Sequence, residues 1–138
     1  MNTLLIYYSF SGKTAALAQK LAAEEGADLL ALQEASHRSK LNAFLSGSRQ
    51  ARGQRQAALR PFSVALAAYD KIIIAMPIWA GFPAPAINNI IELLPQGKEI
   101  ELVITSGSGS SKGSAEKTKA LVEAKGCHVS KYLDIKTG

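Results

Sequence analysis

Hydroxyl side chains and a glycine follow the first apolar run of the chain at a spacing that suits a phosphate. The run from Leu4 to Tyr8 is short and rich enough in β-formers to be a strand buried on both faces. The residues that come after it are Ser9, Ser11, Gly12 and Thr14. From Thr14 onward, apolar residues recur at helical spacing. A turn between a strand and a helix gathers backbone N–H groups, hydroxyls and the positive end of the helix dipole, so this stretch predicts an anion site.

Two better-known phosphate loops do not fit the sequence. Ser11-Gly12-Lys13-Thr14 is similar to the end of a Walker A motif, but that motif needs a glycine where Tyr7 stands. Gly107 and Gly109 could begin a dinucleotide fingerprint, but its third glycine would fall on Lys112. An ordinary capped helix remains an open alternative for the first loop, because helix caps also use Ser and Thr.

Two later loops also carry unusual chemistry. Pro77 to Pro83, PIWAGFP, places the only tryptophan, Trp79, between two prolines, where it offers a large aromatic face. Ser106 to Lys112, SGSGSSK, contains glycines that let backbone N–H groups approach a ligand closely. A tryptophan half-buried over the core is the alternative for Trp79. Three such loops together are not expected of ordinary solvated connections.

Other candidate chemistries are weak, and no catalytic residue is predicted. His37 and His128 lack the spacing and the neighbours of a metal pair, so no metal site is predicted. Cys127 is the only cysteine, which excludes an intramolecular disulfide, and it has no evident base partner, so we expect it in the core. A receiver domain would need acidic residues where Tyr8 and Ser9 stand.

The elements that must position these loops alternate between strand and helix along one domain, residues 1–138. The expected strands are 3–8, 27–32, 70–76, 99–105 and 127–135, and the expected helices start near Thr14, Pro85 and Ser114. Pro77 is expected to end the third strand. This alternation predicts an open parallel sheet with helices on both faces, in which ligands bind beyond the carboxyl ends of the strands.

The basic character of the chain is local. The net charge is +5, and six Lys or Arg residues lie between Ala35 and Tyr69 with no Asp or Glu. The remainder, with ten basic and eleven acidic residues, is close to neutral, so no nucleic-acid partner is predicted. Residues 33–62 contain one short amphipathic turn at Leu41, Phe44 and Leu45, and the segment is either a solvated connection or functional. The apolar N-terminal run is too short for a signal peptide or a membrane span, so the cytoplasm is expected.

The three loops together resemble those of the flavodoxin family. The first loop is similar to the family's phosphate loop. The family's third strand, flavin-flanking loop and following helix are similar to the stretch DKIIIAMPIWAGFPAPAINNII. Its fourth-strand loop is similar to TSGSGSSKGS. FLSGSRQARGQRQAALRPF resembles a long connection found in a bacterial branch of small flavodoxin-like proteins. The resemblance covers nearly the whole chain and implies FMN as cofactor and a five-stranded sheet of order 2-1-3-4-5.

The resemblance also implies roles for residues in each loop. The FMN phosphate would be held by Ser9, Ser11, Gly12, Lys13 and Thr14. One side of the isoalloxazine would be flanked by Pro77, Ile78, Trp79, Ala80 and Gly81. The other side, or the pyrimidine edge, would be held by Ser106, Gly107, Ser108, Gly109 and Ser110.

The sequence departs from the family pattern in four places. Lys13 replaces the usual Asn, no aromatic residue lies between Thr105 and Lys112, a basic segment is present, and the final helix is lacking. Without that helix we expect an apolar strip on one face of the sheet or beside the fifth strand, and we expect a homodimer.

The resemblance leaves three functions open. The leading one is an FMN-binding redox protein that carries electrons between partners. The alternative is an FMN-dependent NAD(P)H:acceptor oxidoreductase of quinone type, and a flavin-free anion-binding or interaction module is the third. The expected partners are accordingly a redox protein or NAD(P)H, with no membrane.

Overall fold

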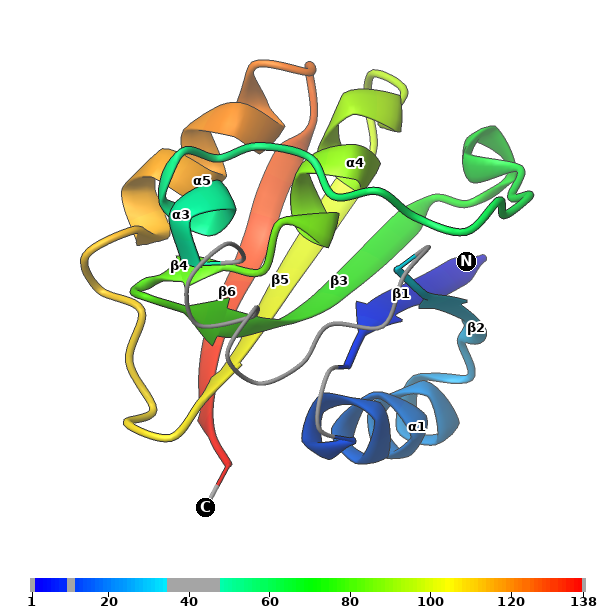
Figure 1. Ribbon diagram of the computed structural model, residues 1–138. Coiled ribbons are helices and arrows are strands. Elements are labelled where there is room, and N and C mark those ends of the chain that lie inside the picture. Colours follow the sequence, from blue (N-terminus) through cyan, green and yellow to red (C-terminus); the bar gives the residue numbers. More distant parts are fainter. Residues whose placement is uncertain (1, 10–11, 35–47, 138) are drawn as a thin grey trace.

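A parallel sheet with helices on both faces forms the molecule (Figure 1). The computed structural model describes residues 2–9, 12–34 and 48–137. Its elements are β1 (Thr3–Tyr8), α1 (Lys13–Glu25), β2 (Asp28–Leu32), α3 (Ser48–Arg52), the 3₁₀ helix η2 (Leu66–Ala68), β3 (Lys71–Trp79), β4 (Phe82–Pro83), α4 (Ala86–Leu93), β5 (Glu99–Ser106), α5 (Ala115–Glu123) and β6 (His128–Lys136). In Figure 1, α1 covers one face of the sheet, and α3, α4 and α5 lie on the other.

The strand order of the sheet is β2-β1-β3-β5-β6, and all these neighbours are parallel. Counted among the parallel strands alone, this is the predicted order 2-1-3-4-5. The chain moves outward from β1 to β2 and then returns to place β3 on the other side of β1. The strand order therefore reverses between β1 and β3, and a crevice beyond the carboxyl ends of these two strands is the expected ligand position.

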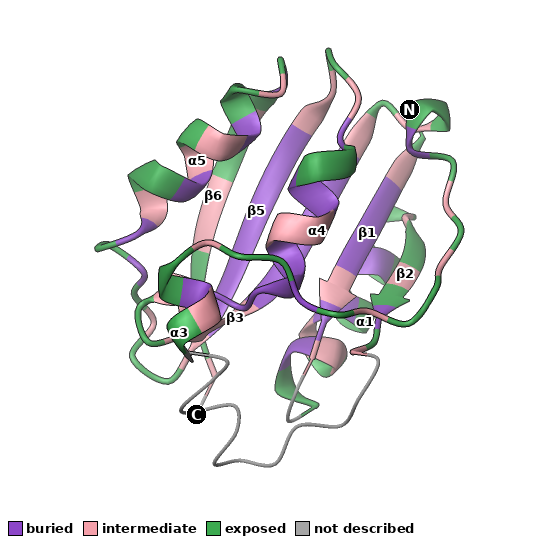
Figure 2. Ribbon diagram, turned by 45° about the horizontal axis from the view of Figure 1, so that its top comes forward, coloured by how far each residue is buried: buried purple, intermediate pink, exposed green. Residues whose placement is uncertain are grey.

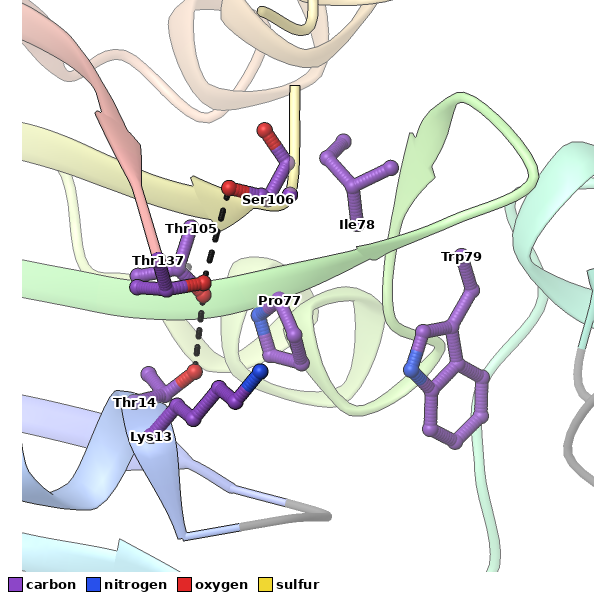
Figure 3. A pocket seen from close by; sticks show the side chains of 9 residues that line it. Lys13, Thr14, Pro77, Ile78, Trp79, Thr105, Ser106 and Thr137 are labelled. Atoms are coloured by element: carbon purple, nitrogen blue, oxygen red, sulfur yellow. Dashed lines mark hydrogen bonds between the residues drawn. The ribbon is translucent and has the colours of Figure 1, made fainter. Parts of the chain in front are cut away.

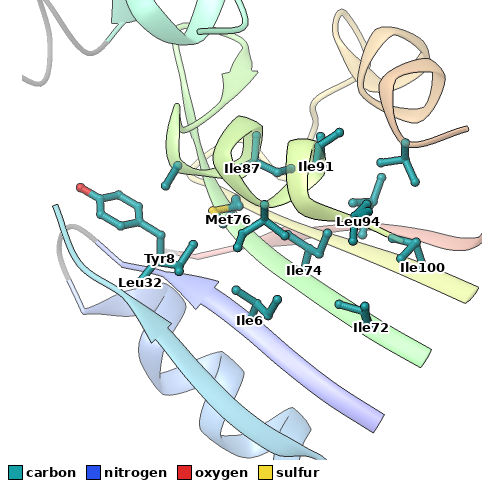
Figure 4. Packing of buried hydrophobic residues seen from close by; sticks show 14 of the residues in the cluster. Ile6, Tyr8, Leu32, Ile72, Ile74, Met76, Ile87, Ile91, Leu94 and Ile100 are labelled. Carbon is teal, nitrogen blue, oxygen red and sulfur yellow. The ribbon is translucent and has the colours of Figure 1, made fainter. Parts of the chain in front are cut away.

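The central strands are buried on both faces, as their continuous apolar runs predict. On one face, Ile6, Ile72 and Ile74 pack with Ile87 and other apolar residues of α4 (Figure 4). On the other face, Leu5 and Ile73 pack with Ala18 and Ala22 of α1. Full burial of one such isoleucine contributes about 1.5–3 kcal/mol, so the two layers fix the sheet and the ends of its strands. Figure 2 shows the same pattern as buried colour along β1, β3 and β5.

The prediction that Pro77 ends the third strand is wrong. β3 continues to Trp79 and folds back on β4, with Ile78 paired to Pro83 and Trp79 to Phe82. Proline is tolerated because the pairing of β3 with β1 extends only to Ala75, so the missing N–H falls beyond that ladder. The tip of this hairpin has φ values of +54° at Ala80 and +87° at Gly81, as a tight two-residue hairpin turn with two left-handed residues requires.

The described part of the basic segment is docked on the fold. Ala51 and Ala57 are 1% and 7% exposed. The side chain of Asn89, in α4, accepts the N–H of Ala57 and donates to its carbonyl, both at 2.8 Å. Further along, Leu59 forms an antiparallel bridge with Glu34 beyond β2. Residues 48–60 are therefore not a loose connection, and the predicted turn at residues 41–45 lies outside the described residues.

The apolar side chains of β6 are less exposed than the sequence predicts. Leu133 and Ile135 are half-buried and pack against the apolar cluster under α1. Among the described residues, the large apolar side chains with more than a third of their surface exposed are Leu29 (45%) and Leu93 (53%), in β2 and α4. The homodimer stays a prediction. In the described ranges, no helix is long and apolar enough to cross a membrane.

Candidate functional site

The first loop presents the start of α1 with little side-chain capping. Gly12 occupies the N-cap position with a φ of +92°, and it has no side chain with which to cap the first turn. The Ser9 hydroxyl accepts the N–H of Gly12 at 2.9 Å, which closes the turn after β1. The hydroxyl of Ser9 therefore closes the turn before α1 and does not cap the first turn of the helix. The first-turn N–H groups of α1 and the exposed Lys13 form a positive end suited to an anion.

Thr14 connects the first loop to the end of β5. Its side chain is only 2% exposed, and its Oγ1 lies 2.7 Å from Oγ1 of Thr105. Either hydroxyl can be the donor, so one of them keeps a proton to donate elsewhere. The pair fixes the distance between the first and third loops, although they are 91 residues apart in sequence.

Trp79 is held beside the first strand by Tyr8. The two rings meet edge to face, with centroids 5.8 Å apart and planes at 77°, a favourable aromatic geometry. The Tyr8 hydroxyl donates to Oε1 of Glu34 at 2.5 Å. Trp79 is half-buried, as expected of a tryptophan that covers the core, but it also lines the cavity described below.

The third loop is held in its turn by hydrogen bonds to the hydroxyls of its own serines. The Ser106 hydroxyl accepts the N–H of Gly109 at 2.9 Å, and the Ser108 hydroxyl accepts that of Ser110 at 3.3 Å. The carbonyl of Ser106 accepts the N–H of Thr137 at 2.8 Å, which ties the loop to the end of β6. Glycine suits position 109 because its φ is +79°, and a Cβ there would make a tight contact of 3.1 Å with Cβ of Lys136.

Ser111 anchors the far end of the third loop. Its buried hydroxyl lies 2.5 Å from the hydroxyl of Tyr132 and donates to Oδ1 of Asp134, also at 2.5 Å. Burial raises the pKa of the Tyr132 phenol, the charge of Asp134 adds to the rise, and the hydrogen bond with Ser111 opposes it. The loop is therefore fixed to β6 at two points, Thr137 and Ser111.

One cavity of about 220 Å³ joins the three loops at the carboxyl ends of β1, β3 and β5 (Figure 3). Its lining consists of Lys13, Thr14, Pro77, Ile78, Trp79, Thr105, Ser106, Gly107 and Thr137. Seven of these were predicted as site residues from the sequence. Thr105 and Thr137 were missed. Thr105 lies at the end of the apolar strand β5, the signal that had singled out Ser9, whereas Thr137 follows the mostly polar strand β6 and carried no such signal.

The other predicted site residues lie around the cavity rather than in its lining. Those within the described part of the chain are Ser9, Gly12, Ala80, Gly81, Ser108, Gly109 and Ser110. Ser11 lies outside the described residues. The structure thus brings together at least one predicted residue from every loop, and what it can do chemically is bind an anion at α1 and a flat group beside Trp79.

Known proteins share this architecture. An open parallel α/β sheet with a ligand cavity at its strand-order reversal defines the class of doubly wound nucleotide-binding folds. The family model described as "Flavodoxin" matches residues 2–135, so the chain belongs to the flavodoxin family. No curated protein matches the sequence closely enough to count as a relative.

Several solved structures share the fold. A protein from Bacteroides eggerthii is 25% identical to this chain with a TM-score of 0.81, and the match covers 96% of this chain and 86% of that protein. One from Bacteroides uniformis is 27% identical with a TM-score of 0.79, covering 99% and 92%. A flavoprotein from Lactobacillus acidophilus, solved in complex with FMN, is 21% identical with a TM-score of 0.80, covering 95% and 91%.

Proposed function

We propose that this protein binds FMN and carries electrons between redox partners. The observation that carries the proposal is the cavity in which the start of α1 meets Trp79 and Ser106. Family membership and the FMN complex of the Lactobacillus flavoprotein support the choice of cofactor. When bound, FMN accepts and releases one or two electrons, and the chain's own residues bind it, orient it and limit its contact with water.

The residues present fit an FMN molecule. A Cβ built on Gly12 or Gly107 would meet no atom within 4 Å, so both loops leave open space beside their backbone. Lys13 and the Thr14–Thr105 hydroxyl pair supply a charge and a donor for a phosphate. Pro77, Ile78 and Trp79 supply an apolar and aromatic wall for a ring.

The exposed tip of the β3–β4 hairpin favours an electron carrier over an enzyme that has its own substrate pocket. Ala80 and Gly81, at its tip, are exposed, while Ile78 and Trp79 just before them line the cavity. A ring placed beside Trp79 would therefore lie close to the molecular surface, where a partner can approach. Mixing the FMN-loaded protein with NADPH tests the alternative oxidoreductase directly, because rapid flavin bleaching without a protein donor would favour it.

The phosphate site gives the first test. The purified protein should be yellow or take up added FMN, and riboflavin should bind much more weakly because it lacks the phosphate. Thr14→Ala should weaken FMN binding by about 1–3 kcal/mol, the range for hydrogen bonds to charged groups, and change riboflavin binding little. Fluorescence titration of both flavins measures the difference.

Thr118 provides the matched control. It is also 2% exposed, but its hydroxyl bonds only within α5, to the carbonyl of Ser114. Thr118→Ala should therefore leave the affinity for FMN unchanged even if it lowers stability. Equal affinity of the wild type for FMN and riboflavin would contradict the assignment of the first loop to the phosphate.

A further inference from the structure

Four cations lie around the β3–β4 hairpin on side chains that do not line the cavity. They are Arg49 and Arg52 of α3, Arg55 just after it, and Lys117 of α5, and all four are exposed. We call this set the hairpin rim. α3 packs against both strands of the hairpin, as Figure 1 shows, with the buried Ala51 on its packed side. The arginines of α3 are therefore left on its outer side.

A second helix adds a cation to the same hairpin. Nζ of Lys117 lies 5.6 Å from the centroid of the Phe82 ring, within the range of a cation–π contact. Phe82 is the residue paired with Trp79 across the hairpin. Cations from α3 and from α5 thus meet at the short hairpin whose first strand supplies the aromatic wall of the cavity.

The backbone that carries the rim arginines is already ordered. Nδ2 of Asn88 donates to the carbonyl of Arg55 at 2.9 Å, and Asn89 holds both backbone groups of Ala57. Within the arginine-bearing turn, the N–H of Arg55 bonds to the carbonyl of Gln50 at 2.9 Å. A partner that docks here loses little further backbone entropy, because α4 has fixed this segment in the free protein.

We propose that the hairpin rim is the docking surface for a redox partner protein with an acidic surface, an inference that rests on the proposed electron-transfer function. Residues 35–69 carry no Asp or Glu to balance the arginines, so an acidic partner would relieve their mutual repulsion. Exposed charges of this kind mainly steer encounter and set which partner is accepted. The rim lies beside Trp79, where a partner's redox centre would come close to a bound ring.

The distribution of the cations favours a protein over a nucleotide. A small anionic ligand is bound by groups that converge in a concave site. Three of the rim cations lie within the α3 segment and the fourth on α5, and none of them lines the described cavity. Exposed cations spread over two elements instead match a broad acidic surface.

Two probe proteins of opposite charge provide the test: an acidic [2Fe–2S] ferredoxin and the basic cytochrome c. Calorimetric titration at low salt measures the association of each with the full chain, with and without FMN. Stopped-flow mixing then measures electron transfer from reduced ferredoxin to the FMN-loaded protein. We expect ferredoxin to associate and cytochrome c not to, and we expect transfer from ferredoxin to slow as ionic strength rises.

Replacing Arg49, Arg52 and Arg55 by Gln should weaken ferredoxin association and slow transfer at low salt by about tenfold or more. The salt dependence should flatten, while FMN affinity stays the same. The control replaces Lys20, Lys125 and Lys131 by Gln, which removes the same charge from α1, from the end of α5 and from β6. It should behave as the wild type. If the triple arginine variant fails to fold, Lys117→Gln alone should lower association about two- to threefold.

The outcomes separate this inference from the proposed function. Association that depends on the rim, in a chain that takes up no FMN, would support the docking surface and refute the flavin function. Equal behaviour of the arginine and lysine variants, or equal association of both probes, would overturn the docking surface. The docking surface would also be overturned if NADPH reduced the bound FMN in the wild type but not in the arginine variant, while ferredoxin failed to associate with either.

Discussion

Trp79 packs against the core and also lines the wall of the cavity. Its ring is fixed edge-on by Tyr8, and the Tyr8 hydroxyl is fixed in turn by Glu34. The arrangement leaves the indole as part of the cavity wall, at the side where the hairpin turns away.

Replacing Trp79 should therefore change the properties of a bound flavin. An adjacent indole quenches flavin fluorescence, so Trp79→Ala should raise the emission of bound FMN. Binding should loosen by about 1–3 kcal/mol, a scale taken from stacking of bases on aromatic side chains. Trp79→Phe, which keeps an aromatic face, should retain part of both effects. Unchanged emission and affinity in Trp79→Ala would place the indole away from the ring.

At the scale of single residues, the sequence indicates which side chains have suitable chemistry for a site better than it indicates their backbone angles or their partners. Hydroxyls and glycines after apolar runs identified the loops, because their chemistry is local. Ala80 could not be predicted to adopt a φ of +54°, since alanine has no preference for the left-handed region and the hairpin imposes it. The pairing of Thr14 with Thr105 was equally hidden, because it depends on where the start of α1 lies relative to the end of β5.

At the scale of the elements, the loop after β5 has a buried polar anchor at its far end. Ser111 connects it to Tyr132 and Asp134 of β6 through one buried hydroxyl. The loop end that lines the cavity, Ser106 and Gly107, is held separately by Thr137. Loss of the Ser111 anchor should let the loop shift without unfolding the sheet.

Ser111→Ala should weaken FMN and riboflavin binding equally, by about 1 kcal/mol, because the loop faces the ring system that both flavins share. This pattern is the opposite of that expected for Thr14→Ala, which affects FMN alone. Ser130→Ala is the control, since that β6 hydroxyl bonds to Glu99 instead. Titrations with both flavins test the prediction, and a loss confined to FMN would show that the anchor serves the phosphate.

The elements themselves were largely predictable, and the exceptions have a physical reason. Buried runs such as Ile72–Ile74 indicate strands by composition alone. The extension of β3 through Pro77 was missed because a proline's cost depends on which neighbour needs its N–H, and the ladder with β1 stops at Ala75. The docking of Ala57 on Asn89 was also hidden, since a sequence does not show which backbone a side-chain amide will meet.

At the scale of the whole molecule, an ion pair joins two strands of the sheet and lies near the helix that covers them. Nζ of Lys71 lies 2.5 Å from Glu101, whose side chain is 7% exposed, and 3.6 Å from Glu25 at the end of α1. The pair therefore joins β3 to β5 and approaches the helix above them. A carboxylate this deeply buried needs its cation, because an unpaired buried charge costs several kcal/mol.

These contacts predict how stability depends on pH. The hydrogen bond with Glu101 raises the pKa of Lys71, burial raises that of Tyr132, and the hydrogen bond with Asp28 raises that of Tyr69. Each group holds its proton more tightly in the folded state than in the unfolded chain. Their contribution is therefore complete below the unfolded values, about pH 10, and is lost as pH rises through the folded values.

The urea midpoint of the flavin-free protein should accordingly change little between pH 7 and about 9.5 and fall steadily above that, as these protons leave. Tyr132→Phe removes one titrating group without emptying its site, so its decline should be shallower than that of the wild type. Lys71→Met should lower stability already at pH 7, because Glu101 is then buried without its cation, and Lys71→Met combined with Glu101→Leu should recover much of the loss. A midpoint that stays constant to pH 11, or a Tyr132→Phe profile identical to the wild type's, would show that these contacts do not set the alkaline limit.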